Sequence, residues 1–141
     1  MTITFETPMT YDGIDAMLAD ARTRLDRISA RAAFQELIAL DALLVDIRPA
    51  AQRAVEGEVA PWLPVLVVER NVLEWRFDPR SDARLPEASY ERRVVVLCQE
   101  GYTSSLAAES LRRLGVDRAT DVVGGFAAWR EAGMPVAGAA A

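Results

Sequence analysis

Residues 94–105 read VVVLCQEGYTSS and include the only cysteine of the chain, Cys98. The apolar run from Val94 to Leu97 is typical of a buried strand, which places the thiol at the carboxyl end of that strand. A helix is expected from Ser104 to Leu114, because apolar residues recur there at helical spacing and a glycine follows. The free N–H groups at the start of this helix would then face the sulfur, which makes Cys98 a candidate nucleophile.

The loop after the cysteine bears on two interpretations of Cys98. A free cysteine in an apolar stretch is often only a small core residue. Gly101, however, allows a backbone turn with positive φ, and the loop can then point several N–H groups inward as a nest for an anion. Such a nest stabilises a thiolate without a general base. The residues predicted to form it are Gln99, Glu100, Gly101, Tyr102, Thr103 and Ser104.

The composition excludes most base-assisted chemistry, since the chain has no histidine and all 16 of its basic residues are arginine. No Ser-His-Asp triad, Cys-His pair, Schiff-base lysine or phosphate-loop lysine can form. Ser104 and Ser105 have no base to activate them, so we expect them to cap the helix. Glu100 would repel a thiolate, so we expect its carboxylate to point to solvent.

Charge and hydropathy limit the partners. The net charge is −5 at pH 7 and no run of basic residues occurs, which argues against nucleic acid. The first residues lack the basic and apolar regions of a signal peptide, and no stretch approaches about 18 uninterrupted apolar residues. We therefore expect a soluble cytoplasmic protein without membrane contact. Neither a metal nor a cofactor is expected, because a single cysteine without histidine offers no metal site.

At 141 residues, 51% of them apolar, the chain is expected to form one α/β domain. Short apolar strands alternate with helices, which predicts a mainly parallel central sheet flanked by helices. Asp46, Arg70 and Cys98 lie at or just beyond predicted strand ends and could share one site. Residues 71–90 are expected to form a long irregular excursion. The other predicted helices are 12–26, 30–39 (with Ser29 as its cap) and 126–132, and the other predicted strands are 43–48, 64–68 and 119–123.

Three segments, VDIR at 45–48, CQEGYTSS at 98–105 and DVVGGFAAWREAGMPV at 121–136, resemble the rhodanese-like, single-domain sulfurtransferase family in order and spacing. The resemblance covers residues 27–136, leaving residues 1–26 as an N-terminal helical extension and 137–141 as a frayed tail. It implies that Cys98 takes a sulfane sulfur from a donor such as thiosulfate, holds it as a persulfide and passes it to a thiol or cyanide-like acceptor. This exchange needs neither histidine nor lysine.

The loop after Cys98 departs from the family pattern in its charge. Many relatives carry an arginine or another cation in the loop, commonly at the position of Thr103, whereas the only charge in this loop is Glu100. This departure argues against the dianion thiosulfate as the donor and favours a less charged sulfane donor or a protein persulfide. The stretch usual after the first strand is also altered here, with Gly57-Glu58-Val59 followed by Trp62 and Pro64.

Two alternative functions stay open. A cysteine phosphatase would use the same strand, loop and helix, but it requires Cys-x5-Arg, and Ser104 occupies the arginine position. A sulfur-carrier or regulatory binding module would keep the fold without useful turnover.

Several further residues are predicted to support the site. Asp46 is expected to bond into the active loop, through backbone N–H groups or Thr103, and Arg48 to pair with a nearby carboxylate. Arg70 or Arg76 could partly replace the missing loop charge. The alternative for that segment is a solvated helix with Trp75 packed inward. Phe126 and Trp129 are expected in the core, and the N-terminal helix is expected to be a packing cover, although its Arg22 and Arg24 leave a role in partner binding open.

Overall fold

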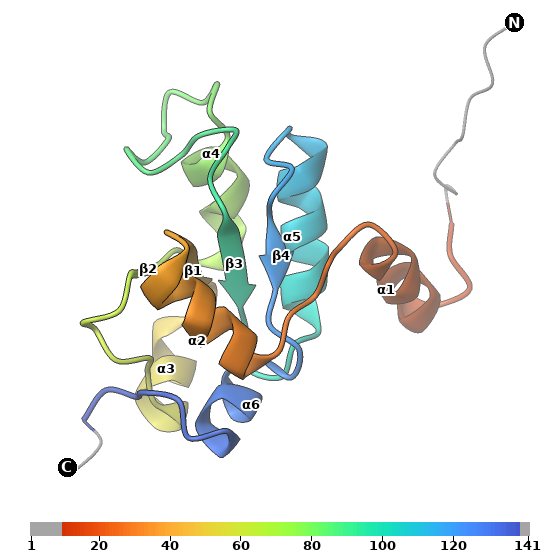
Figure 1. Ribbon diagram of the computed structural model, residues 1–141. Coiled ribbons are helices and arrows are strands. Elements are labelled where there is room, and N and C mark those ends of the chain that lie inside the picture. The colour runs from red at the N-terminus through yellow and green to blue at the C-terminus, as the bar shows by residue number, and fades with distance from the viewer. Residues whose placement is uncertain (1–9, 139–141) are drawn as a thin grey trace, which may run out of the picture.

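The computed structural model describes residues 10–138 and contains a parallel sheet between two layers of helices (Figure 1). The strand order is β2-β1-β3-β4, and every pairing is parallel. This confirms the predicted α/β fold with a parallel central sheet. The strands are β1 (Leu43–Asp46), β2 (Val65–Val67), β3 (Val94–Leu97) and β4 (Thr120–Asp121).

The helices differ from the predictions in their ends and in short helices that were not predicted. The helix α3 was not predicted, and the expected irregular stretch after residue 70 begins with the short helices η1 and α4. The predicted helix 12–26 is shorter, because the chain leaves the helix after Arg22 to run beside the sheet. The helices are α1 (Ile14–Arg22), α2 (Ala30–Ala39), α3 (Ala50–Glu56), η1 (Arg70–Val72), α4 (Leu73–Phe77), α5 (Thr103–Arg113) and α6 (Gly125–Glu131).

The alternating side chains of β3 divide the core into two layers. Val94 and Val96 pack with α4 and α5, while Val95 and Leu97 pack with α2 and α6 on the opposite face. A strand buried on both faces needs apolar residues at every position, which explains the uninterrupted run in the sequence. Phe126 and Trp129 lie in the second layer, as predicted.

The segment before α2 joins the sheet beside β4. Ile28 pairs in parallel with Val122, and α1 lies outside the layers, against α5 (Figure 1). The Ser29 hydroxyl accepts the Ala32 N–H and caps α2, as predicted. The segment from α1 to Ile28 therefore follows the same side of the domain as α5 and the end of β4.

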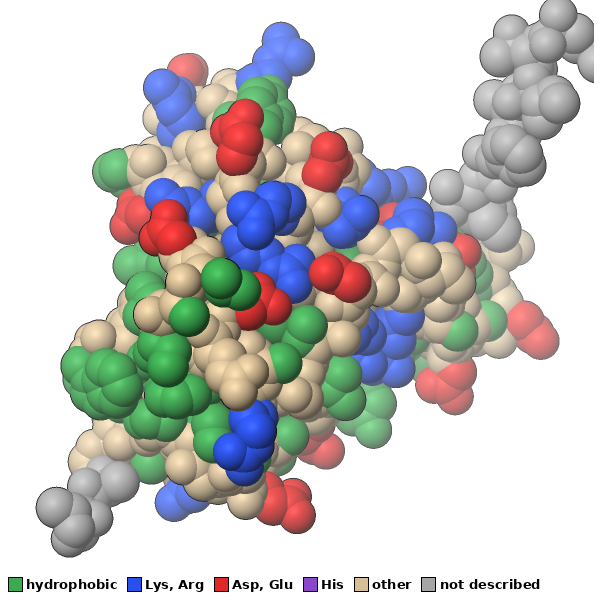
Figure 2. Space-filling model, viewed as in Figure 1, with side chains coloured by type: hydrophobic (Ala, Val, Ile, Leu, Met, Phe, Trp, Pro, Cys, Tyr) green, Lys and Arg blue, Asp and Glu red, His purple; other side chains and the backbone are tan. Residues whose placement is uncertain are grey.

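Charged side chains of both signs are interspersed on the face shown in Figure 2, while apolar side chains gather near β2 at the sheet edge. Trp62 and Val67 are exposed in this region. In the described part of the chain, no helix has the length and apolar character needed to span a membrane.

Candidate active site

Cys98 directly follows β3 and is almost completely buried. Its Sγ accepts the backbone N–H groups of Gly101 at 3.2 Å and of Ser104 at 3.4 Å. The turn that makes this possible has φ = 85° at Gly101, in the left-handed region that glycine enters without strain. Two backbone N–H groups of the loop thus converge on the sulfur, an arrangement typical of an anion-binding nest.

The loop carries further unpaired N–H groups. Those of Glu100, Tyr102 and Thr103 donate to no acceptor within residues 10–138, and the side chains of all three are exposed. Glu100 is exposed to solvent, in line with its expected repulsion from a thiolate. Cys98 and these loop residues border a cavity of about 320 Å³. Its other lining residues are Ile47, Arg48, Pro49, Gln52, Arg70 and Gln99.

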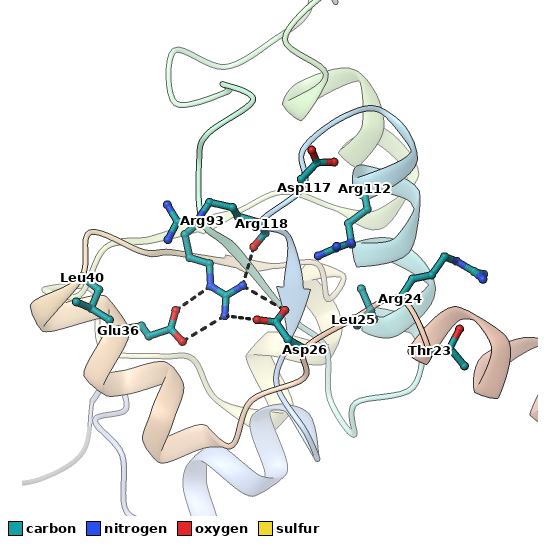
Figure 3. Close-up of a pocket in the computed structure, with 10 residues that line it drawn as sticks. All are labelled: Thr23, Arg24, Leu25, Asp26, Glu36, Leu40, Arg93, Arg112, Asp117 and Arg118. Carbon is teal, nitrogen blue, oxygen red and sulfur yellow. Dashed lines mark hydrogen bonds and ion pairs between the residues drawn. The ribbon is translucent and has the colours of Figure 1, made fainter.

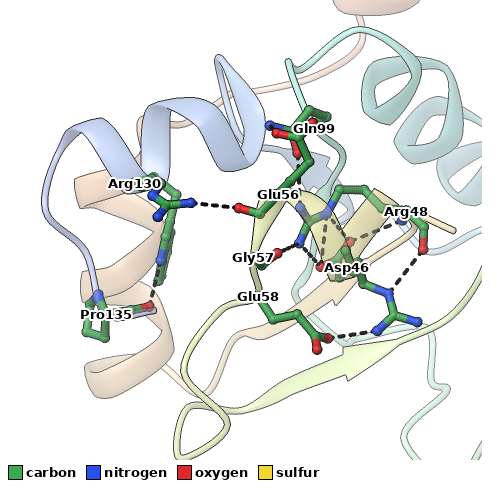
Figure 4. A network of polar contacts seen from close by, with 10 residues as sticks. Asp46, Arg48, Glu56, Gly57, Glu58, Gln99, Arg130 and Pro135 are labelled. Carbon is green, nitrogen blue, oxygen red and sulfur yellow. Dashed lines mark hydrogen bonds and ion pairs between the residues drawn. The ribbon is translucent and has the colours of Figure 1, made fainter. Parts of the chain in front are cut away.

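The end of β1 supports the loop through Arg48, which is fully buried. Its guanidinium bonds both carboxylate oxygens of Asp46, the closest contact being 2.7 Å, and its Nη1 donates to the Gln99 side-chain oxygen at 3.0 Å. The Gln99 amide then donates to Glu56 of α3 (Figure 4). The predicted contact of Asp46 with the active loop or Thr103 is therefore wrong. The buried carboxylate pairs with Arg48, the cation that compensates its charge.

The two serines at the start of α5 do not cap the helix, contrary to the prediction. The cap position is Tyr102, and the hydroxyls of Ser104 and Ser105 donate to the Asp121 carboxylate at 2.7 and 2.8 Å. Asp121 is completely buried at the end of β4, and Arg27 bonds both of its oxygens. Both serines lie inside α5, which begins at Thr103, and not at its cap position, so their hydroxyls donate to the buried carboxylate instead. The sequence interpretation missed Asp121, which lies in the middle of the predicted strand 119–123 and at the end of the observed β4.

The two arginines predicted near the site lie in different places. Arg70 lines the Cys98 cavity and pairs with Glu74 at 2.9 Å. Arg76 instead donates to the Ala83 carbonyl and does not line that cavity. Trp75 is exposed, so the alternative with this side chain packed inward is wrong. Leu73 and Phe77 occupy the buried face of α4 instead.

A larger cavity, of about 650 Å³, lies away from the thiol, between the segment after α1, α2 and the residues flanking β3 and β4 (Figure 3). Its central side chain is Arg93, which bonds Glu36, Asp26 and the Arg118 carbonyl. Burial lowers the pKa of the Arg93 guanidinium, but its bonds to Glu36 and Asp26 outweigh this effect and raise the pKa. Because the Arg93 charge is paired and no nucleophile lines this cavity, it does not compete with the Cys98 loop as the reactive site.

Comparison with known proteins identifies the family. The family model for the rhodanese-like domain matches residues 30–132, so the chain belongs to the rhodanese-like domain family. By sequence, the chain is 36% identical over 87 residues to adenylyltransferase and sulfurtransferase MOCS3-1 of Zea mays, covering 62% of this chain and 18% of that protein. It is 40% identical over 52 residues to thiosulfate sulfurtransferase GlpE of Actinobacillus pleuropneumoniae serotype 5b, covering 37% of this chain and 48% of GlpE. The chain thus matches less than half the length of these relatives.

Two solved structures match most of the chain. A protein of unknown function from Rhodopseudomonas palustris CGA009, described as a possible tyrosine phosphatase, is 30% identical, with a TM-score of 0.79 and coverage of 93% of this chain and 99% of that one. The polysulfide-sulfur transferase homodimer of Wolinella succinogenes is 23% identical, with a TM-score of 0.70 and coverage of 86% and 85%. The second likeness is one of fold.

Proposed function

We propose that this protein is a sulfurtransferase that carries a sulfane sulfur as a persulfide on Cys98. The observation that carries the proposal is the pair of N–H bonds from Gly101 and Ser104 to Sγ, in a chain without histidine or lysine. These bonds stabilise a thiolate by position alone, which suits a nucleophile that needs no general base. The sulfurtransferase names of several relatives support the same chemistry.

The reaction has two exchange steps. The Cys98 thiolate attacks the outer sulfur of the donor, a sulfur–sulfur bond forms, and the donor leaves with the electron pair of its broken bond. An acceptor thiolate or cyanide then attacks the outer sulfur of the persulfide and releases the Cys98 thiolate. The unpaired N–H groups of Glu100, Tyr102 and Thr103 belong to residues that border the cavity, where the anionic outer sulfur would be held.

The charges around the cavity favour a donor that is less charged than thiosulfate. Arg48 is paired with Asp46 and Arg70 with Glu74, while Glu100 at the rim has no cationic partner in the described chain. A dianion gains little attraction in these surroundings. We therefore propose polysulfide, a small persulfide or a protein persulfide as the donor and a thiol as the acceptor.

Intact-protein mass spectrometry tests the proposal. Wild type and Cys98→Ser are incubated with thiosulfate, polysulfide or a low-molecular-weight persulfide, and then with cyanide or thiol. We expect a gain of one sulfur on wild type alone, which cyanide or thiol removes. A protein that gains sulfur but does not pass it to an acceptor in repeated turnovers is the carrier module considered above. No gain from any donor refutes the proposal.

Phosphatase activity is the second candidate, because a relative of 30% identity is described as a possible tyrosine phosphatase. The position of the phosphate-binding arginine is taken by Ser104, whose hydroxyl is committed to the buried Asp121. We expect hydrolysis of p-nitrophenyl phosphate by wild type to equal that by Cys98→Ser. A rate above that control would favour the phosphatase.

A further inference from the structure

Arg22 and Arg27, which precede the matched family domain, bind the loop that follows Cys98. Arg22 Nη2 donates to the Gly101 carbonyl at 2.8 Å, and Arg27 Nη2 donates to the same oxygen at 2.9 Å. Gly101 is one of the two residues whose N–H groups donate to Cys98 Sγ. The match to the family model begins only at residue 30. The chain ahead of the matched domain therefore contributes two cations to a loop that has none of its own.

Each arginine is held in place by a separate element. Ile28 pairs with the end of β4, its N–H donating to the Asp121 carbonyl at 3.2 Å, and this pairing sets Arg27 beside the Asp121 carboxylate. Arg27 Nε bonds that carboxylate at 2.9 Å. Arg22 lies in the last turn of α1, which packs on α5, and its Nε donates to Ser105 Oγ at 3.0 Å. The two guanidiniums thus reach Gly101 from different anchors.

Arg22 also touches the loop at a second point, since its guanidinium lies 6.0 Å from the centre of the Tyr102 ring. The polar contacts close a circuit. Ser105 bonds Asp121, Asp121 bonds Arg27, and both arginines bond the Gly101 carbonyl. The circuit fixes the peptide that joins Gly101 to Tyr102, and neither arginine lines the Cys98 cavity. Because a bonded carbonyl polarises its own peptide, the Tyr102 N–H becomes a stronger donor.

We propose that Arg22 and Arg27 are positioning residues for sulfur transfer, an inference that rests on the proposed function. They hold the Gly101 carbonyl, keep the loop N–H groups in place for the anionic sulfur, and supply positive charge behind a loop that lacks a cation. The segment from α1 to Ile28 then positions the loop of the site in addition to packing against the domain.

Arg22 gives the sharper test, because loss of Arg27 leaves the buried Asp121 without its cation and can unfold the protein. Arg22→Met removes the two loop contacts and keeps an apolar stem. Arg24→Met is the matched control: Arg24 bonds Asp20 and Glu109 of α5, and it makes no contact with the loop. Urea unfolding establishes the folded fraction of each variant. Quenched mass spectrometry then gives the rate of sulfur gain on Cys98 against polysulfide concentration.

We expect Arg22→Met to lower the saturating rate of sulfur gain at least fivefold, with the half-saturating polysulfide concentration changed less than twofold. Arg24→Met should stay within twofold of wild type in both. Arg22→Lys, which keeps the charge but has a single donor nitrogen, should lie between wild type and Arg22→Met. Equal losses in Arg22→Met and Arg24→Met, or no loss in Arg22→Met, overturn the positioning role while leaving the proposed function intact. A wild type that gains no sulfur overturns both.

Discussion

Gly101 and Gly124 approach so closely that a β-carbon on Gly101 would lie 2.7 Å from the Gly124 backbone nitrogen. The first glycine belongs to the loop after β3 and the second to the turn between β4 and α6. The start of α6, which follows this turn, is also joined to the loop, since the Phe126 N–H donates to the Cys98 carbonyl at 2.8 Å. The loop around the thiol is thus shaped by the β4–α6 turn as well as by α5.

Substitution of Gly101 by alanine should displace this loop. The new β-carbon would contact Gly124, and φ = 85° is unfavourable for any residue with a side chain. We expect a loss of about 1–3 kcal/mol in the free energy of unfolding, measured with urea, and at least a tenfold slower sulfur gain on Cys98.

Gly133→Ala is the control for backbone strain alone. Gly133 has φ = 76°, but a β-carbon there would meet no atom within 4 Å. We expect a loss of about 1 kcal/mol and an unchanged rate of sulfur gain. Equal rates for Gly101→Ala and Gly133→Ala would show that the close approach of the two glycines does not shape the site.

The Asp46–Arg48 pair should be a strong but replaceable stabilising contact. Arg48→Met leaves a buried carboxylate without its cation, so we expect a loss of about 3–5 kcal/mol in urea unfolding. The double variant Asp46→Leu/Arg48→Met should recover most of this loss. Arg53→Met, which breaks the half-exposed pair with Glu58, should cost about 1 kcal/mol or less. A double variant as unstable as Arg48→Met would contradict this account.

Arg70 should influence anionic donors selectively, because its partly exposed guanidinium is the cavity cation nearest to solvent. For Arg70→Met we expect the half-saturating concentration of thiosulfate to rise about two- to fivefold, in keeping with a screened charge. The half-saturating concentration of an uncharged organic trisulfide should be the same in Arg70→Met as in wild type. Arg76→Met is the matched control on the neighbouring helix. A thiosulfate effect as large in Arg76→Met would argue for the net charge of the protein instead.

The attachment of α1 should depend on pH through Asp20. Hydrogen bonds from Arg24 and Tyr11 lower the pKa of Asp20 from 3.8 to about 2. A lowered folded-state pKa means that the contribution to stability is complete above the unfolded value and is lost as the pH falls towards 2. We expect the stability difference between wild type and Asp20→Asn, measured with urea, to be constant from about pH 5 to about pH 9 and to shrink towards pH 2.

The hydrogen bond between Tyr11 and Asp20 also makes the stability depend on pH at high pH, through Tyr11. The hydrogen bond to Asp20 raises the pKa of Tyr11 above 10, so its contribution is complete below pH 10 and is lost as the pH rises through the folded value. Asp15→Asn is the control, since this α1 carboxylate makes no hydrogen bond within residues 10–138. An Asp20→Asn difference that does not vary with pH would contradict the assignment.

Local sequence patterns predicted the parts of the fold that depend on neighbouring residues. The strand Val94–Leu97 was predicted with its observed bounds, because a strand buried on both faces leaves an uninterrupted apolar run. The turn at Gly101 was predicted because few other residues enter its backbone conformation. The helix α3 was missed because it buries no residue and so leaves no apolar period.

The sequence by itself determined the class of the fold, the place of Cys98 at a strand end, and a chemistry without histidine or lysine. Only the tertiary structure decided the partners of the long polar side chains. Arg27 and Asp121 are 94 residues apart, and their pairing exists because Ile28 lies beside β4. Ser104 and Ser105, which were predicted to cap the helix, donate to the same carboxylate instead. A buried charge binds the strongest compensating group that the packed elements bring within reach, and no local pattern records which group that is.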